Sequence, residues 1–173
     1  MTPLFPGVLG ERFDALPPLV RRMHGGGRIT ARGRAVSAGR GVGALAARVI
    51  LGAPGRGRYA LRFEVEPGDD GEVWTRWFGE RRLRSRLRAD AGDPRRLEER
   101  MGPASFRLSL RATASGFGWE LRGWRLGPLP LPRWLAPIVR ARCFEAGGEY
   151  RFSVIVAHAW LGVVMAYAGR LKL

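Results

Sequence analysis

The side chains best suited to catalysis in this 173-residue sequence are two histidines, His24 and His158, and a single cysteine, Cys143. A catalytic zinc ion needs three protein ligands, which two histidines cannot supply alone, and the chain has no His-Glu-x-x-His or cysteine-rich spacing. A single cysteine also excludes an internal disulfide, as is usual in a reducing compartment. We therefore predict no metal site and no bound cofactor.

The surroundings of these three residues favour structural roles. His158 shares a predicted strand face with Tyr150 and Phe152, which is typical of a core or rim histidine that bonds a backbone carbonyl. His24 ends a predicted helix, where a positive charge is favourable, and Cys143 lies in a predicted strand as a small buried residue. We assign no catalytic residue, and an enzyme that uses His158 with a neighbouring acid remains an alternative.

The densest basic feature is the segment RRLRSRLR, residues 81–88. As a strand it sets four arginines in one row about 7 Å apart, close to the phosphate spacing of a nucleic-acid strand. These candidate anion-binding residues are Arg82, Arg84, Arg86 and Arg88. Acidic residues on neighbouring predicted strands, such as Glu64 and Glu98, would pair with much of the row. We therefore favour a solvated, paired face over an anion site, and we do not expect nucleic acid as a partner.

A glycine-rich motif, GRGVGA at residues 39–44, matches the G-x-G-x-x-A pattern that can hold a pyrophosphate before a helix. The dinucleotide-binding fold needs parallel strands joined by crossover helices. The chain after this motif instead has the two-residue period of antiparallel strands. We interpret the glycines as the start of a capping helix.

Alternation of apolar and polar side chains with a period of two dominates the chain from Arg58 onward and predicts β-strands. In YALRFEVE, residues 59–66, the tyrosine, leucine, phenylalanine and valine share one face. Short turns force neighbouring strands to be antiparallel, and so large a sheet curls or closes to protect its edges. We predict a mainly β fold: a curled antiparallel sheet or a closed or half-open barrel of about nine to ten strands, with two short N-terminal helices and the outline of a lipocalin or fatty-acid-binding protein.

The length of the chain fits one domain, residues 1–173. We predict that residues 1–52 form a helical cap with one strand and that residues 58–173 form an antiparallel meander. The two helices, in LGERFDALPPLVRRMHGGG and GVGALAARVILG, would plug or cap one end of the barrel. The longest uncharged segment, residues 153–169, is shorter than the ~20 apolar residues of a spanning helix and is interpreted as a hairpin.

An apolar, proline-broken segment, GPLPLPRWLAP at residues 127–137, contrasts with the polar composition usual for connections between strands. Folded over the barrel end, it would cover an apolar interior; pointed outward, it would suit a membrane interface. We predict the first arrangement, with an apolar or lipid-like small molecule held between the sheet and this loop. The predicted ligand-binding residues are Phe63, Trp77, Leu108, Trp119, Leu131, Trp134, Phe152, His158 and Tyr167.

The sequence carries 30 lysines and arginines against 15 acidic residues, a net charge of +15. Such an excess favours polyanions, including anionic lipid surfaces. Only Lys172 is a lysine, however, and genomic base composition alone can produce that bias. The N-terminus lacks the basic and apolar pattern of an export signal. We expect a cytoplasmic protein, with attachment to an anionic membrane surface as the alternative.

Four segments together resemble a known family: LGERFDALPPLVRRMHG, GEVWTRWFGERRLRSRL, LGPLPLPRWLAP and VAHAWLGVVMAYAG. They are similar to the bacterial domain of unknown function 4166, over nearly the whole chain. The resemblance implies a compact domain that is sometimes appended to dinucleotide-binding, reductase-like proteins, so a reductase-like domain is a candidate partner. It implies no catalytic residues, because none are assigned in the family.

Taken together, these patterns favour a binding module without catalytic activity over an enzyme. The predicted ligand is an apolar or amphipathic small molecule inside the barrel. The alternative is a peripheral domain that docks on a membrane or a partner through its basic surface and apolar loop.

Overall fold

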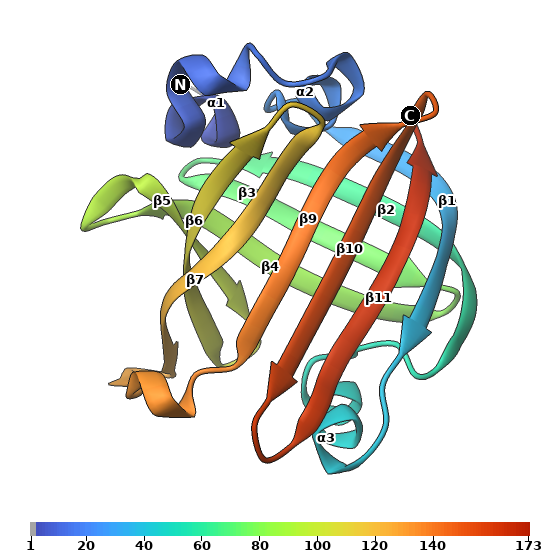
Figure 1. Cartoon of the computed structure of the whole chain (residues 1–173), viewed down its shortest axis with the longest axis vertical. Coiled ribbons are helices and arrows are strands. Elements are labelled where there is room, and N and C mark those ends of the chain that lie inside the picture. The colour runs from blue at the N-terminus through green and yellow to red at the C-terminus, as the bar shows by residue number, and fades with distance from the viewer. Residues whose placement is uncertain (1–2) are drawn as a thin grey trace.

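The computed structural model describes residues 3–173, without the side chain of Arg133, and shows a closed antiparallel β-barrel (Figure 1). Ten strands form its wall: β1 (Ile29–Ala38), β2 (Gly57–Gly68), β3 (Gly71–Phe78), β4 (Arg81–Asp90), β5 (Asp93–Met101), β6 (Ala104–Thr113), β7 (Gly116–Leu126), β9 (Ile138–Ala146), β10 (Glu149–His158) and β11 (Gly162–Lys172). The two-residue strand β8 (Leu129–Pro130) pairs beside the end of β7. The prediction of a mainly β barrel of about nine to ten strands is confirmed.

The ring of strands is closed at two places. β1 lies between β2 and β11, and β7 pairs with both β6 and β9. The first strand of the chain thus meets the last one in an antiparallel seam, and the strand edges are paired around the ring. β1 is therefore part of the barrel wall, whereas we expected it within the N-terminal cap.

The helices lie at opposite ends of the barrel (Figure 1). α1 (Leu4–Leu9), the short 3-10 helix η1 (Gly10–Phe13) and α2 (Pro18–His24) cover one end, which we call the capped end. α3 (Val42–Ile50) packs against β11 at the other end. The prediction that both early helical segments cap one end is wrong, because the ten residues of β1 between them span about 33 Å and cross the wall. None of the helices in residues 3–173 is long and apolar enough to cross a membrane.

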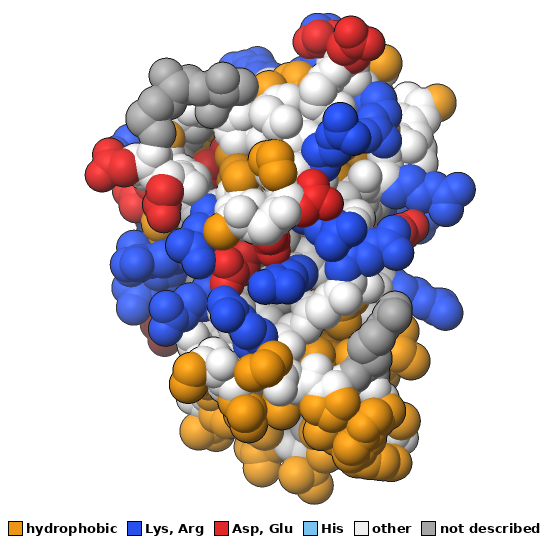
Figure 2. Space-filling view, turned by 90° about the vertical axis from the view of Figure 1, so that its left-hand side faces the viewer, with side chains coloured by type: hydrophobic (Ala, Val, Ile, Leu, Met, Phe, Trp, Pro, Cys, Tyr) orange, Lys and Arg blue, Asp and Glu red, His pale blue; other side chains and the backbone are white. Residues whose placement is uncertain are grey.

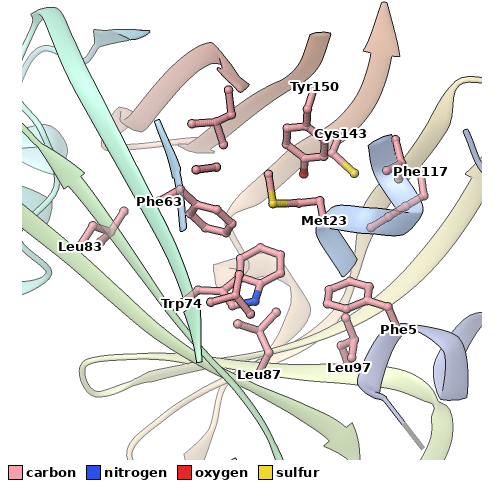
Figure 3. Packing of buried hydrophobic residues seen from close by; sticks show 14 of the residues in the cluster. Phe5, Met23, Phe63, Trp74, Leu83, Leu87, Leu97, Phe117, Cys143 and Tyr150 are labelled. Atoms are coloured by element: carbon pink, nitrogen blue, oxygen red, sulfur yellow. The ribbon is translucent and has the colours of Figure 1, made fainter. Parts of the chain in front are cut away.

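The capped end is sealed by side chains from α1 and α2. Phe5, Val20 and Met23 are almost fully buried. Figure 3 shows Phe5 and Met23 within the cluster that the barrel wall contributes. The ring of Phe5 stacks on Trp74 of β3 at a centroid distance of 5.6 Å and lies 5.5 Å from the ring of Phe117 of β7. Burial of these large rings gives the N-terminal helices a fixed place on the barrel.

The seam between β1 and β11 depends on small residues. The inward positions of β1 are Ala31, Gly33, Ala35 and Ser37. A Cβ atom at Gly33 would overlap the carbonyl oxygen of Arg170 on β11. The two backbones therefore approach more closely than a side chain at this position allows, as is common where a barrel wall bends sharply.

We expect Gly33→Ala to destabilise the protein by roughly 2 to 4 kcal/mol, because the added methyl group pushes the closing strands apart. Chemical denaturation followed by circular dichroism measures the change. Gly123→Ala is the matched control, since a Cβ atom at this glycine of β7 has open space around it. Equal stability of the two variants would contradict the proposed role of the seam.

Candidate functional site

The barrel encloses a cavity of about 80 Å³. Its wall comes from eight of the ten strands of the ring, all except β1 and β4, and is mostly apolar. Five of the predicted ligand-binding residues line it: Phe63, Leu108, Trp119, Phe152 and Tyr167. Alternating side chains of one strand face the same side of the sheet, so these positions on five different strands converge on one interior.

One charge pair lies in this apolar wall. The Arg76 guanidinium on β3 is 3.7 Å from a carboxylate oxygen of Glu99 on β5, and both side chains are mostly buried. Arg76 also donates a hydrogen bond of 3.1 Å to the hydroxyl of Ser85. Its guanidinium carbon lies 5.1 Å and 5.7 Å from the ring centroids of Trp74 and Phe63. Both Arg76 and Glu99 line the cavity, so a guest molecule would meet a polar group within an apolar surface.

The interior is reached from the end that carries α3. Near the cap, the inward side chains of Phe117, Cys143 and Tyr150 are almost fully buried. Farther along the same strands, toward α3, the inward side chains of Trp119 and Val156 are partly exposed. The capped end is therefore closed, and we call the α3 end the mouth.

A buried polar cluster lies where the cap meets the cavity. His24 Nε2 shares a hydrogen bond of 2.9 Å with the Tyr150 hydroxyl, and Cys143 Sγ lies 3.7 Å from the same nitrogen. Burial lowers the pKa of His24 to about 3 and raises the pKa of Cys143 to about 12. Burial also raises the pKa of Tyr150 well above its usual value. All three groups are thus neutral near neutral pH, and the thiolate needed for nucleophilic chemistry is disfavoured.

This cluster was not predicted from the sequence. His24 does end α2, but the expectation of a favourable positive charge there is wrong, because the buried ring is neutral. The expectation for Cys143, a small buried residue in a strand, agrees with its place in β9. His24 lies more than a hundred residues from Cys143 and Tyr150 in the chain, so local spacing carries no signal of the contact.

Another carboxyl group is buried near the cavity wall. Glu72, at the start of β3, accepts a 2.8 Å hydrogen bond from the indole Nε1 of Trp74. Burial raises the pKa of Glu72, and this hydrogen bond opposes the rise. The inner face of β3 therefore presents both an acid and, at Arg76, a cation.

Trp77 was predicted to face the interior and instead lies on the outer face of β3. Its indole Nε1 donates a 2.9 Å hydrogen bond to Glu64, and the guanidinium groups of Arg62 and Arg82 lie over its ring. Trp74 and Trp77 are three residues apart and cannot share one face of a strand. The structure turns Trp74 inward together with Arg76.

The proline-rich loop does not cover the mouth as predicted. Leu129 and Trp134 are 60% and 69% exposed, and Leu131 is half-buried. His158 lies beside this loop rather than in the cavity lining: its Nδ1 accepts a hydrogen bond of 3.3 Å from the backbone N–H of Trp160 in the β10–β11 turn. Leu131, Trp134 and His158 thus lie outside the cavity lining, and the enzyme alternative loses the pocket that it required around His158.

The four arginines of the predicted anion stripe all point outward from β4 and are exposed. Arg88 pairs with Glu98 at 2.8 Å, and Arg82 lies over the Trp77 ring. Arg84 and Arg86 have no ion pair among residues 3–173. The expected cross-strand pairing therefore involves only one member of the row within the described part of the chain. That part also holds no group of three potential metal ligands among histidine, cysteine, aspartate and glutamate.

Comparison with known protein families identifies one match. The model described as Domain of unknown function (DUF4166) matches residues 16–171 of the chain. The chain therefore belongs to the DUF4166 family. No curated protein matches it. The matched range of this DUF4166 domain includes α2, α3 and the barrel wall except the last residue of β11, and thus the residues that line the cavity.

The neutral His24 predicts a dependence of stability on pH. The unfolded chain takes up a proton at this residue near pH 6.5, whereas the folded protein resists protonation down to about pH 3. The contribution of the neutral His24 to the free energy of unfolding is complete above pH 6.5 and is lost as the pH falls. Between pH 6.5 and about pH 4.5, we expect this loss to approach about 1.4 kcal/mol per pH unit. Urea unfolding across this range measures it.

Two variants isolate this effect from other titrating groups. Glu72, whose pKa is raised in the fold, acts in the opposite sense as the pH falls, so the informative quantity is the difference from wild type. His24→Gln removes the titrating ring and should make stability less sensitive to acid. Tyr150→Phe keeps the His24 imidazole and should leave the dependence of stability on acid unchanged. An unchanged pH profile in His24→Gln would refute the assignment.

Proposed function

We propose that the DUF4166 barrel is a binding module for a small apolar or amphipathic molecule with an uncharged polar group. The observation that carries the proposal is a cavity that is lined mainly by apolar side chains, contains one charge pair and opens at one end only of the described barrel. Apolar pockets with a few fixed polar groups are typical of small-molecule sites. The neutral His24, Cys143 and Tyr150 cluster supports binding rather than catalysis.

The charges inside the barrel favour an uncharged polar group on the ligand. Glu99 balances Arg76 at 3.7 Å, and the carboxyl group of Glu72 is buried on the same inner face of β3. An anionic ligand would have to compete with Glu99 for the guanidinium and would gain no net positive potential. A hydroxyl, amide or ester can hydrogen-bond to the pair without adding charge.

The size of the cavity favours a slim ligand. An engineered protein cavity of about 150 Å³ accepts benzene, and the cavity here, at about 80 Å³, is roughly half as large. A narrow, unbranched chain fits this volume better than a ring system. The open mouth allows the far end of such a chain to extend beyond the enclosed space.

The test compares two six-carbon ligands that differ in charge, hexan-1-ol and hexanoate. We expect hexan-1-ol to raise the melting temperature and to change the fluorescence of the cavity tryptophans, because a ligand that binds only the folded state stabilises it. Hexanoate should bind at least about tenfold more weakly, since its carboxylate must compete with Glu99 for the Arg76 guanidinium. Tighter binding of hexanoate would overturn the assignment of an uncharged group.

A cavity-filling variant shows where the ligand binds. Ala141 lines the cavity from β9, so Ala141→Phe should abolish the response to hexan-1-ol. Ala168→Phe is the matched control, because Ala168 is exposed on the outer face of β11. A response that survives in Ala141→Phe, or no response in the wild type to either ligand, would count against a binding site in the barrel. Native mass spectrometry of gently purified protein would reveal a molecule carried from the cell.

A further inference from the structure

The helix at the mouth has its faces reversed relative to an ordinary surface helix. α3 buries its small residues, Gly43 and Ala47 among them, against the barrel. Its large apolar side chains are exposed instead: Val42 is 76%, Leu45 59% and Val49 78% exposed. An amphipathic helix of a water-soluble protein normally packs its large apolar side chains inward. The outer face of α3 is therefore built to contact something apolar outside the molecule.

Two loops continue this apolar surface around the mouth. The rings of Trp134, in the proline-rich loop, and Trp160, in the β10–β11 turn, lie 6.0 Å apart between centroids. The backbone of Leu161 in the same turn packs against Gly43 of α3. We call the surface formed by α3, residues 126–138 and residues 159–163 the apolar rim. Figure 2 shows apolar side chains gathered over the lower end of the molecule, the end that carries α3 in Figure 1.

The apolar rim accounts for nearly all exposed large apolar side chains of residues 3–173. The exceptions are Val36 on β1 and Ile155 on β10. Soluble monomers rarely expose contiguous apolar surface of this kind unless it serves an interaction. Because these exposed apolar side chains gather at one end, around the mouth of the cavity, we interpret them as a docking surface and not as scattered surface residues.

Charge identifies the class of partner. Arg40 precedes α3, Arg48 lies on it and Arg140 follows the proline-rich loop; all three are exposed. They have no ion pair in the described part of the chain. Basic side chains also border the apolar end in Figure 2, and the chain carries a net charge of +15. A second copy would bring the same positive charge to the contact, whereas an anionic bilayer offers the opposite charge and an apolar interior.

We propose that the apolar rim docks on an anionic lipid bilayer, with the mouth of the barrel facing the membrane. Trp134 and Trp160 would lie at the level of the headgroups, where tryptophan is favoured. The outer face of α3 would enter the boundary between headgroups and acyl chains, and the arginines would contact lipid phosphates. This docking does not require a ligand in the cavity and can be tested separately from it.

Co-sedimentation with vesicles tests the proposal. We expect the protein to bind phosphatidylglycerol vesicles and to bind pure phosphatidylcholine vesicles at least about tenfold more weakly. Raising the salt concentration from about 0.05 M to about 0.5 M should weaken binding to phosphatidylglycerol, because it screens the arginines. Equal binding to both lipids in low and high salt would overturn the electrostatic part of the proposal.

A matched pair of double variants locates the contact. Leu45→Glu with Val49→Glu adds two negative charges to the exposed face of α3 and should reduce vesicle binding by about tenfold or more. Ala15→Glu with Thr30→Glu adds the same charge at two exposed positions, one just before α2 and one at the start of β1, and should reduce vesicle binding far less. Circular dichroism checks that both fold. Equal loss in the two variants would show that net charge alone drives binding and would overturn the apolar rim as the docking surface.

Two further measurements separate the remaining outcomes. Lipids brominated near the headgroup should quench the tryptophan fluorescence of the wild type, and quenching should fall in Trp134→Phe with Trp160→Phe. Ala141→Phe, which fills the cavity, should bind vesicles like the wild type, so a failure of ligand binding leaves this result intact. Membrane docking would be refuted if the protein bound neither kind of vesicle and sedimented as a dimer. It would also be refuted if the protein bound neither kind of vesicle and bound a reductase-like domain through the apolar rim.

Discussion

The antiparallel seam between β1 and β11 is the constraint on which the rest of the molecule depends. It joins the first strand of the chain to the last, and glycines on both strands, Gly33 and Gly169, leave the two backbones room to approach. With the ring closed, alternate side chains of ten strands must face a common interior. The seam also sends the chain from the capped end to the mouth along β1, and so assigns α2 and α3 to opposite ends.

The two ends of the barrel use their helices in different ways. At the capped end, aromatic and aliphatic side chains enter the barrel and exclude water, so that His24 and Cys143 remain neutral there. At the mouth, α3 rests on the wall through glycine and alanine, and its large side chains point away. A helix attached through small residues leaves its apolar area available to a partner. One end of the barrel is thus closed by buried side chains, and the other end exposes large apolar side chains.

Sequence periodicity was sufficient for the wall of the barrel, and it placed Phe63, Leu108 and Tyr167 on the inner face, where the structure has them. It failed where a strand pattern fits either orientation, as with Trp74 and Trp77. In the structure Trp74 packs inward against Phe5 and Phe63. Arg76 on the same face pairs with Glu99 two strands away, and no local pattern reveals these contacts. Periodicity also cannot say what lies across the barrel, and the contacts of His24 arise only after the ring has closed. In the proline-rich loop, the neighbour of Trp134 is likewise distant in the sequence: the ring of Trp160.

A barrel sealed at one end and open at the other imposes an order on any molecule that enters it. For a ligand of the kind proposed, the leading end would rest against the Tyr150 and Cys143 side chains, the trailing end would stay at the mouth, and departure would reverse the same route. Orientation is therefore set on arrival, since the enclosed space is too narrow for a chain to turn around. A surface that covered the mouth would then be the phase with which such a ligand exchanges.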